Sequence, residues 1–487
     1  MKHFIVLLSS LGFALGGCTK LRSPQPDRPL PPFPEFTETS GDERETSQAA
    51  GPWWLVFGDP ALQALIDQGL EQNLTLRQQW ARLEQSKALA DQARAGRFPQ
   101  VRATGNVGWN RSVGAFGSAT SQSASVSLPV SYELDVFARA ARTHQAASLE
   151  AEATREDVDA MALTMSAQIA EAWYDLVNTR AREALLQQQS ELDATYLELV
   201  TLRFREGLAS SVDVHQQRLQ AARSASQMEL TELQRELFEQ QLALLLGRTR
   251  GELSLPEGAT LPELGAAPPT GASGDLIEQR PDVRAAQRRV EASDRRIAAA
   301  VAARMPSIRL NVTPGYSWNR NEFGDDSPIG GGEARVASGF TLGAGASIDI
   351  PLFDGFAGRS AVRAQESGQQ LLIEAFHQVV LQALFEVESA IRQEHHQARN
   401  LELLRTQATI ADETLESAQA RFRAGLSDYL PVLGALQARH ALRLQLQDAE
   451  RQVVSSRIQL HRALGGAWNA ERPEPSRLRE NEEGDES

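Results

Sequence analysis

The sequence predicts an α+β fold in which one unit, two strands followed by two long helices, occurs twice. Residues 203–208, Arg-Phe-Arg-Glu-Gly-Leu, return as Arg-Phe-Arg-Ala-Gly-Leu at residues 421–426, an offset of 421 − 203 = 218 residues. A Leu-Gly pair at 246–247 returns at 464–465 with the same offset, 464 − 246 = 218. Two segments of alternating apolar and polar residues, and then a heptad pattern, precede each motif. A duplicated strand–strand–helix–helix unit is therefore expected.

The chain begins with a segment that predicts a signal peptide at residues 1–17. Residues 4–15 are almost wholly apolar, but they are too few to span a bilayer as a helix. They lead into Leu-Gly-Gly-Cys, in which Cys18 is the only cysteine of the chain. This pattern resembles a bacterial lipobox, with cleavage before Cys18 and a covalent lipid on its sulfur. The alternative is an ordinary signal peptide with an incidental cysteine. Thr19, in place of an aspartate, indicates the outer membrane.

Residues 18–52 are predicted to form a lipidated tether, because 23–34 are rich in proline. The net charge of −14 argues against nucleic acid as a partner. A lone cysteine excludes an intrachain disulfide. Since no later segment is apolar enough for a membrane helix, the chain could enter a bilayer only as a closed β-barrel.

The first repeat is expected at 53–250 and the second at 276–468. Residues 61–97 show a helical period that Pro99 ends. Strands are predicted at about 100–137 and again at about 306–353, where apolar and polar residues alternate strictly. The polar residues are small and hydrophilic, as a water-filled lumen requires. The predicted lumen residues are Arg102, Thr104, Asn106, Ser127, Ser131, Asn311 and Ser347.

Four strands cannot close a barrel, since the smallest membrane barrels use eight. Other copies of the chain must complete the sheet, and three copies give twelve strands. The alternative is a soluble sandwich with one wet face. Against that alternative, the four alternating segments are longer than typical soluble strands.

Helical hairpins are predicted at about 141–247 and 358–465. Val158, Ala162 and Met165 begin a heptad seam, and adding 218 to their numbers gives Phe376, Val380 and Ala383 in the same register. Each hairpin reverses at the glycine of its repeated motif. Residues 251–275 form a linker, and 469–487 form an acidic tail that is predicted to be disordered.

Taken together, these residues resemble the outer-membrane efflux factor family of trimeric channel-tunnels. The resemblance rests on the order and spacing of several short motifs. They are the lipobox at Cys18, the Trp-Trp opening at 53–54 with Asp-Pro at 59–60, Arg-Pro-Asp-Val at 280–283, Tyr-Glu-Leu-Asp-Val-Phe at 132–137, Ile-Pro-Leu-Phe-Asp-Gly at 350–355, and the two Arg-Phe-Arg-x-Gly-Leu turns.

The resemblance implies a homotrimer with a twelve-stranded transmembrane β-barrel, four strands per chain, continuous with a periplasmic α-helical coiled-coil barrel. It implies a channel of the outer membrane, in contact with its lipid, that conducts small molecules from a periplasmic adaptor (membrane fusion) protein and an inner-membrane pump of the resistance-nodulation-division type. The alternatives are an exit duct for type I protein or metal-ion export and a structural or adhesin lipoprotein. The residues do not identify the exported substrate.

The family's hairpin tips meet the adaptor and close the aperture. Carried over by the resemblance, the adaptor-facing residues are Arg203, Gly207, Leu208, Arg421, Gly425 and Leu426. An acidic residue that family members often carry is replaced by Gly434. The residues expected to form the gate instead are Asp213, Asp428, Tyr429 and Arg423. Ala138 and Phe356 stand where the family commonly has glycine.

No catalytic, cofactor or metal site is predicted, and the chain is not expected to be an enzyme. His395 and His396 follow Glu394 within a long polar helix, which favours a solvated helix face over a metal site. Residues 330–332, Gly-Gly-Gly, are not followed by the Lys-Ser/Thr of a phosphate loop. The only group expected on the chain is the lipid of Cys18.

Overall fold

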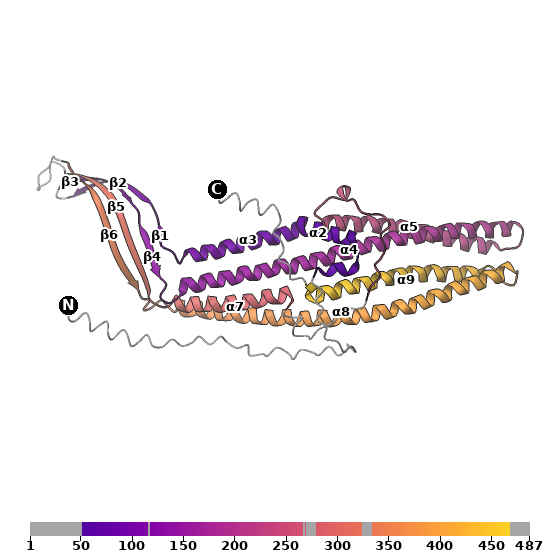
Figure 1. Ribbon diagram of the computed structural model, residues 1–487. Coiled ribbons are helices and arrows are strands. Elements are labelled where there is room, and N and C mark those ends of the chain that lie inside the picture. Colours follow the sequence, from indigo (N-terminus) through magenta and orange to yellow (C-terminus); the bar gives the residue numbers. More distant parts are fainter. Residues whose placement is uncertain (1–50, 115–116, 266–267, 269–278, 324–333, 468–487) are drawn as a thin grey trace. The chain divides into compact units, whose positions relative to one another are not determined.

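A computed structural model describes residues 51–114, 117–265, 268, 279–323 and 334–467. The described residues divide into two compact units. The sheet unit comprises Gln85–Glu152 and Gln287–Ala375, and the hairpin unit comprises residues 51–84, 153–286 and 376–467. Two strands followed by two long helices occur twice along the chain, so the predicted duplication is confirmed. Figure 1 shows the elements with their labels.

Six strand segments form one antiparallel sheet. They are β1 (Gln100–Val101), β2 (Thr104–Gly114), β3 (Gly117–Ser127), β4 (Val130–Leu134), β5 (Ser307–Phe323) and β6 (Arg335–Asp349). β2 pairs with β3, β5 pairs with both β3 and β4, and β6 pairs with β5. The pairing of β5 with β3 and β4 therefore joins the two repeats in one sheet.

The six segments behave as four strands, because the register does not change at the interruptions. Thr104 lies opposite Ser127 and Val101 lies opposite Val130, so the two gaps each contain two residues. Pro129 has no N–H to donate, which breaks the ladder at this point. Arg102 still donates its N–H to the Pro129 carbonyl, with an N–O distance of 3.0 Å.

One face of the sheet is apolar, and no described part of the chain covers it. The register places Val126, Tyr316 and Phe340 side by side across three strands. The rings of Tyr316 and Phe340 meet edge to face with centroids 5.1 Å apart. Val107 and Phe340 are each 91% exposed. An apolar sheet face of this extent requires a partner other than water.

The turns that connect strand to helix contain two strained residues at equivalent positions of the repeats. Ala138 has φ 58° and Phe356 has φ 68°, and their numbers differ by 356 − 138 = 218. Both are in the left-handed region, which costs a residue with a Cβ about 1–2 kcal/mol. Asp135 caps the first helix by accepting the Ala140 N–H at 3.0 Å. The second helix is capped in the same way by Asp354, which accepts the Gly358 N–H at 2.7 Å.

Four long helices form two hairpins. The first contains α4 (Arg139–Arg205) and α5 (Ser211–Leu245), and the second contains α8 (Ala357–Arg423) and α9 (Leu430–Ala463). Figure 1 shows each pair running antiparallel. In the described part of the chain, no helix combines the length and the apolar character needed to cross a membrane.

The helix expected over residues 61–97 is two helices, α2 (Pro60–Gln72) and α3 (Leu74–Ala95). Asn73 separates them with an extended ψ of 125°. Its amide donates to the Leu245 carbonyl at 2.7 Å, and its Oδ1 accepts the Thr75 N–H at 2.8 Å. The helical period continues on both sides of Asn73, so the hydrophobic pattern alone did not indicate the break.

The tryptophan-rich opening of the described chain packs into the hairpin unit. The 3₁₀ turn η1 (Trp53–Phe57) buries its aromatic side chains in a cluster that includes Trp173 of α4 and Ile458 of α9. Trp53 donates its indole N–H to the Ser166 hydroxyl at 3.1 Å. Trp173 donates to the Asp59 carboxylate at 2.8 Å. These contacts tie the first hairpin to the second.

A buried arginine connects the start of α7 (Pro281–Ala302) to the second hairpin. Arg280 precedes α7 and is buried. It donates to Glu386 of α8 at 2.8 Å and to the Ala463 carbonyl of α9 at 3.0 Å. The Arg-Pro-Asp-Val motif therefore fixes the entry to the second repeat on the second hairpin.

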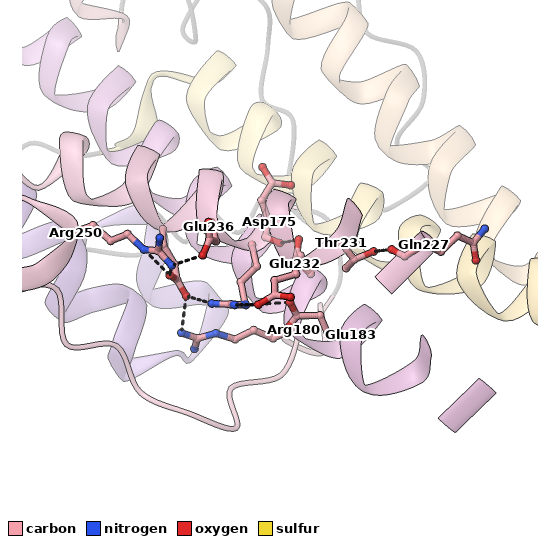
Figure 2. A network of polar contacts seen from close by, with 11 residues as sticks. Asp175, Arg180, Glu183, Gln227, Thr231, Glu232, Glu236 and Arg250 are labelled. Atoms are coloured by element: carbon pink, nitrogen blue, oxygen red, sulfur yellow. Dashed lines mark hydrogen bonds and ion pairs between the residues drawn. The ribbon is translucent and has the colours of Figure 1, made fainter. Parts of the chain in front are cut away.

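A charged network links α4, α5 and the turn η2 (Arg250–Glu252) (Figure 2). Arg235 of α5 donates to Glu183 of α4 at 2.9 Å. Glu239 of α5 accepts from Arg250 at 3.1 Å and from Arg235 at 3.1 Å. Single exposed ion pairs contribute little, but a network in which several charges share partners holds the helices in register.

Replacing Ala138 by glycine should raise stability by about 1 kcal/mol, because glycine adopts a positive φ without a Cβ clash. The change is measured as the apparent melting temperature of the purified protein. Ala140→Gly, inside the first turn of α4, is the matched control and should lower stability by up to about 1 kcal/mol. Equal effects of the two substitutions would contradict the assigned strain.

Candidate functional site

Both hairpins reverse through the same glycine turn. Gly207 has φ 73° and Gly425 has φ 72°. The residue after each glycine donates its N–H to the carbonyl five positions back, Leu208 to Arg203 at 2.8 Å and Leu426 to Arg421 at 2.9 Å. This pattern is a Schellman motif, which satisfies the last carbonyls of a helix. Nothing lies within 4 Å of a Cβ added at either glycine, so each requires glycine for its backbone conformation only.

A tip cluster of apolar side chains joins the two hairpin ends. Its buried members are Val200, Val214, Leu415, Phe422, Tyr429, Val432, Leu433, Ala435 and Leu436. The cluster draws on α4, α5, α8 and α9. The two turns are therefore parts of one packed end within the protomer.

The two copies of the Arg-Phe-Arg motif have different surroundings. Arg203 stacks on Phe422, with its guanidinium carbon 4.3 Å from the ring centroid. Phe422 is buried, whereas its equivalent Phe204 is 44% exposed. Arg421, the equivalent of Arg203, is exposed. Arg203 was expected to face the adaptor, but its guanidinium packs against the other hairpin.

Two residues expected at the gate have other roles in the protomer. Tyr429 is only 2% exposed, and its hydroxyl donates to the Gln217 amide oxygen at 2.7 Å. Burial, and then the nearby groups Tyr196, Asp193 and Asp213, raise the pKa of Tyr429, so it stays a neutral donor. Asp213 forms a capping box with Ser210, accepting its N–H at 2.9 Å. Neither side chain is free to act as a latch in this conformation.

The remaining tip residues are exposed. Leu208 is 67% exposed and Leu426 is 72% exposed. Asp428 and Arg423 are exposed as well, and Arg423 donates to Gln419 of its own helix at 3.3 Å. Gly434 is also exposed, so the position that lacks the acidic side chain is a bare helix surface.

The seven predicted lumen residues share one face of the sheet. Thr104 lies opposite Ser127, with 2.8 Å between their hydroxyl oxygens. Ser131 lies opposite Asn311 in the next pair of strands. The alternation of strand faces places Arg102, Asn106 and Ser347 on this same side. Cys18, the predicted lipid site, lies outside the described residues.

Sequence reasoning missed the polar residues buried behind the tip. Asp193 of α4 and His440 of α9 are almost fully buried, at 0% and 5% exposed. His440 follows Val432 and Leu436 at intervals of four along the apolar side of its helix. That spacing was a signal that the histidine is buried. In the described part of the chain, no three His, Cys, Asp or Glu side chains gather as a metal site would require.

Comparison with known proteins assigns both repeats to one family. The family described as outer membrane efflux protein matches residues 65–248 and 272–466, which takes in both repeats. The chain is 26% identical to the outer membrane protein OprJ of Pseudomonas aeruginosa, over 94% of this chain and 95% of that protein. It is 28% identical to the toluene efflux pump outer membrane protein TtgF of Pseudomonas putida, over 96% of this chain and 97% of that protein.

Solved structures have the same fold. The outer-membrane channel OprN superposes with a TM-score of 0.80 and 25% identity, covering 91% of this chain and 99% of that one. The CmeC outer membrane channel of Campylobacter jejuni superposes with a TM-score of 0.80 and 18% identity, covering 94% of this chain and 98% of that one. The latter likeness is one of fold.

The asymmetry of the two arginines can be tested by substitution. Arg203→Met removes the charge above the Phe422 ring and should weaken the tip by about 1 kcal/mol, which is about fivefold in the population of the opened tip. Chymotrypsin cleavage near the tip, in the purified protein, should become faster by that factor. Arg421→Met is the matched control and should leave the cleavage rate nearly unchanged. Equal rates in the two variants would show that the stacking is not stabilising.

Proposed function

Because the chain belongs to the outer membrane efflux protein family, we propose that it is the outer-membrane channel of a tripartite efflux pump. It conducts small molecules passively to the outside and performs no chemical reaction. It lies in the outer membrane and extends into the periplasm. Both repeats match the family, and the relatives named above are outer membrane proteins, which supports this assignment.

The observation that carries the proposal is the two-sided sheet. One face presents hydroxyls and amides, and the other presents uncovered apolar side chains such as Val107 and Phe340. In a bilayer the apolar face contacts lipid tails and the polar face contacts water. A soluble sandwich would instead bury the apolar face in its own core.

The same sheet supports a trimer. Its outer strands, β1–β2 and β6, each leave one edge unpaired among the described residues, and lipid cannot satisfy backbone N–H and C=O groups. Three copies close a sheet of twelve strands. The arginine and hydroxyl side chains of the polar face would then line the lumen.

We propose a chain organisation on the basis of the sequence. Residues 1–17 are a signal peptide, 18–52 a lipidated tether, and 469–487 an acidic tail. The repeats occupy 53–250 and 276–468, with a linker at 251–275. Lipid on Cys18 adds an anchor to that supplied by the sheet.

The partners proposed are a periplasmic adaptor protein and an inner-membrane pump of the resistance-nodulation-division type. The relatives support a role in efflux but not one substrate. One is named for toluene efflux and another, OpmQ of Pseudomonas putida, for pyoverdine export. The polar sheet face presents hydroxyl, amide and arginine side chains, which mark no single substrate class, so we assign substrate selection to the pump.

The tips are proposed as the adaptor dock and the periplasmic gate. The exposed docking residues are Leu208, Leu426 and Arg421, presented by the turns at Gly207 and Gly425. Arg203 contributes by holding Phe422 in place. Asp428 and Arg423 are the exposed charges available to the gate, and Asp213 and Tyr429 support it by capping and packing.

Gly425→Pro should abolish drug resistance in an efflux-deficient host while trimers still reach the outer membrane. Proline requires φ near −65°, whereas Gly425 has φ 72° and donates its N–H to Phe422 at 3.1 Å. Gly207→Pro should act alike. The measurements are minimal inhibitory concentrations and the amount of trimer in outer-membrane fractions.

Gly258→Pro is the matched control, because Gly258 also has a positive φ, 78°, but lies in the linker. It should leave resistance intact. Normal export by both tip variants would mean that the adaptor grips another part of the helices. Channel activity itself is tested by single-channel conductance in planar bilayers, and a trimer without conductance would favour the structural lipoprotein.

Lipidation is tested by intact mass. The mature protein should begin at Cys18 and carry the added mass of its acyl chains, and Cys18→Ser should lack that mass. Because the sheet itself contacts the bilayer, the serine variant should still be extracted only with detergent. An unmodified N-terminus in the wild-type protein would disprove the lipid.

A further inference from the structure

A polar seam lies behind the tip cluster, where α9 packs against the first hairpin. It contains Asp193 of α4, Gln217, Gln220 and Ser224 of α5, and Tyr429, Gln437 and His440 at or in α9. Several hydrogen bonds cross between the hairpins, among them one from the Gln189 amide of α4 to the His440 carbonyl at 3.5 Å. Tyr429 donates to Gln217 at 2.7 Å, and Gln437 donates to the Gln220 amide oxygen at 3.2 Å.

Asp193 is the centre of this seam. Its Oδ2 accepts from the Ser224 hydroxyl at 2.6 Å and from the Gln220 amide at 3.3 Å. Its backbone carbonyl accepts from Gln217 at 2.8 Å. A buried carboxylate needs such donors, because an unpaired charge in a protein interior is costly.

The seam is not fully satisfied. Among the described residues, the second carboxylate oxygen of Asp193, Oδ1, has no hydrogen-bond partner, and neither ring nitrogen of His440 has one. Unpaired polar atoms in a buried site lose their hydrogen bonds to water without replacement, which destabilises the packed state. Separation of α9 from the first hairpin would let water reach them, so the packed seam is less stable than a fully paired one.

The charges around His440 come from three helices. Asp193 faces it from α4, and Arg439 is its neighbour in α9. Arg439 pairs with Asp412 of α8 at 2.7 Å, and Arg443 of α9 pairs with the same carboxylate. The seam residues of α5 are amides and a hydroxyl. Burial lowers the pKa of His440, the Asp193 carboxylate opposes this effect, and the Arg439 charge adds to it, with a net lowering.

We propose that His440 is a proton sensor in the periplasmic hairpins: its protonation favours separation of α9 from α4 and α5 behind the tip. This deepens the proposed function and rests on it only in identifying the seam with the wall of the periplasmic gate. The packed seam buries the His440 imidazole without a hydrogen bond to the Asp193 carboxylate and so favours its neutral form. A separated seam hydrates the imidazole and accepts the proton.

The sign of the effect follows from linkage. The pKa of hydrated histidine is about 6.5, and in the packed seam it is lower. The packed seam is therefore fully favoured above pH 6.5 and loses its advantage as the pH falls below that value. For one proton, the equilibrium constant for separation of the seam rises by at most about tenfold for each unit of pH below 6.5, until the pKa of the packed state is reached.

Hydrogen–deuterium exchange of the full-length trimer in detergent tests the proposal. Peptides that cover residues 429–444 are compared at pH 7.5 and 5.5, after correction for the intrinsic exchange rate. The wild-type protein should lose severalfold to tenfold protection there at pH 5.5. His440→Phe and His440→Gln, an apolar and a polar replacement that do not titrate in this range, should show no such loss.

His215→Gln is the control, since His215 is an exposed histidine of α5 near the same tip. It should keep the wild-type response. Unchanged protection in the wild-type protein, or a wild-type response in His440→Phe, would overturn the proposal. If both His440 variants fail to assemble, Arg439→Gln is the deciding variant. The Arg439 charge lowers the pKa of His440, so its removal should reduce the loss of exchange protection at pH 5.5. An unaltered loss of protection would overturn the proposal.

Conductance at the two pH values separates this inference from the proposed function. A seam that loosens in acid without any change in conductance would support the proton sensor and contradict its place in the gate. A seam that does not loosen refutes the sensor, whether or not the protein conducts.

Discussion

The pairing of β5 with β3 and β4 is the interaction on which the rest of the sheet depends. It brings together strands from the two repeats, in one uninterrupted antiparallel register from Ala119 opposite Phe323 to Leu134 opposite Ile308. Because successive side chains of a strand point to opposite faces, a shift of one residue would move the hydroxyls of one repeat onto the apolar face of the other. The register therefore creates the two-sided sheet.

Much of this fold could be predicted from sequence because its signals are long. Alternation over a dozen residues fixes a strand and its faces, and a heptad pattern shared across 218 residues fixes a duplicated helix. Predictions that rested on one residue were less successful. Asn73 ends one helix and starts the next through its side chain, and the contact with the Leu245 carbonyl that makes this possible is distant in sequence.

The candidate site was predicted in outline but not in its contacts. The glycine turns follow from the repeated motif, because both copies need the same positive φ. The family resemblance also implied that both arginines would face the adaptor. The structure distinguishes them, since Arg203 stacks on a ring from the other repeat whereas Arg421 is exposed. Such a pairing depends on how the two hairpins pack, which no pattern within one repeat records.

The exposed leucines at the two turns have a consequence for how a partner binds. Each protomer offers two similar apolar contacts, Leu208 and Leu426, so the proposed trimer offers a ring of them. Each contact alone is weak, but a partner that engages several at once gains from a high effective concentration after the first is made. Binding by such a ring is selective for partners of matching symmetry. A monomeric protein that touches a single leucine would dissociate quickly.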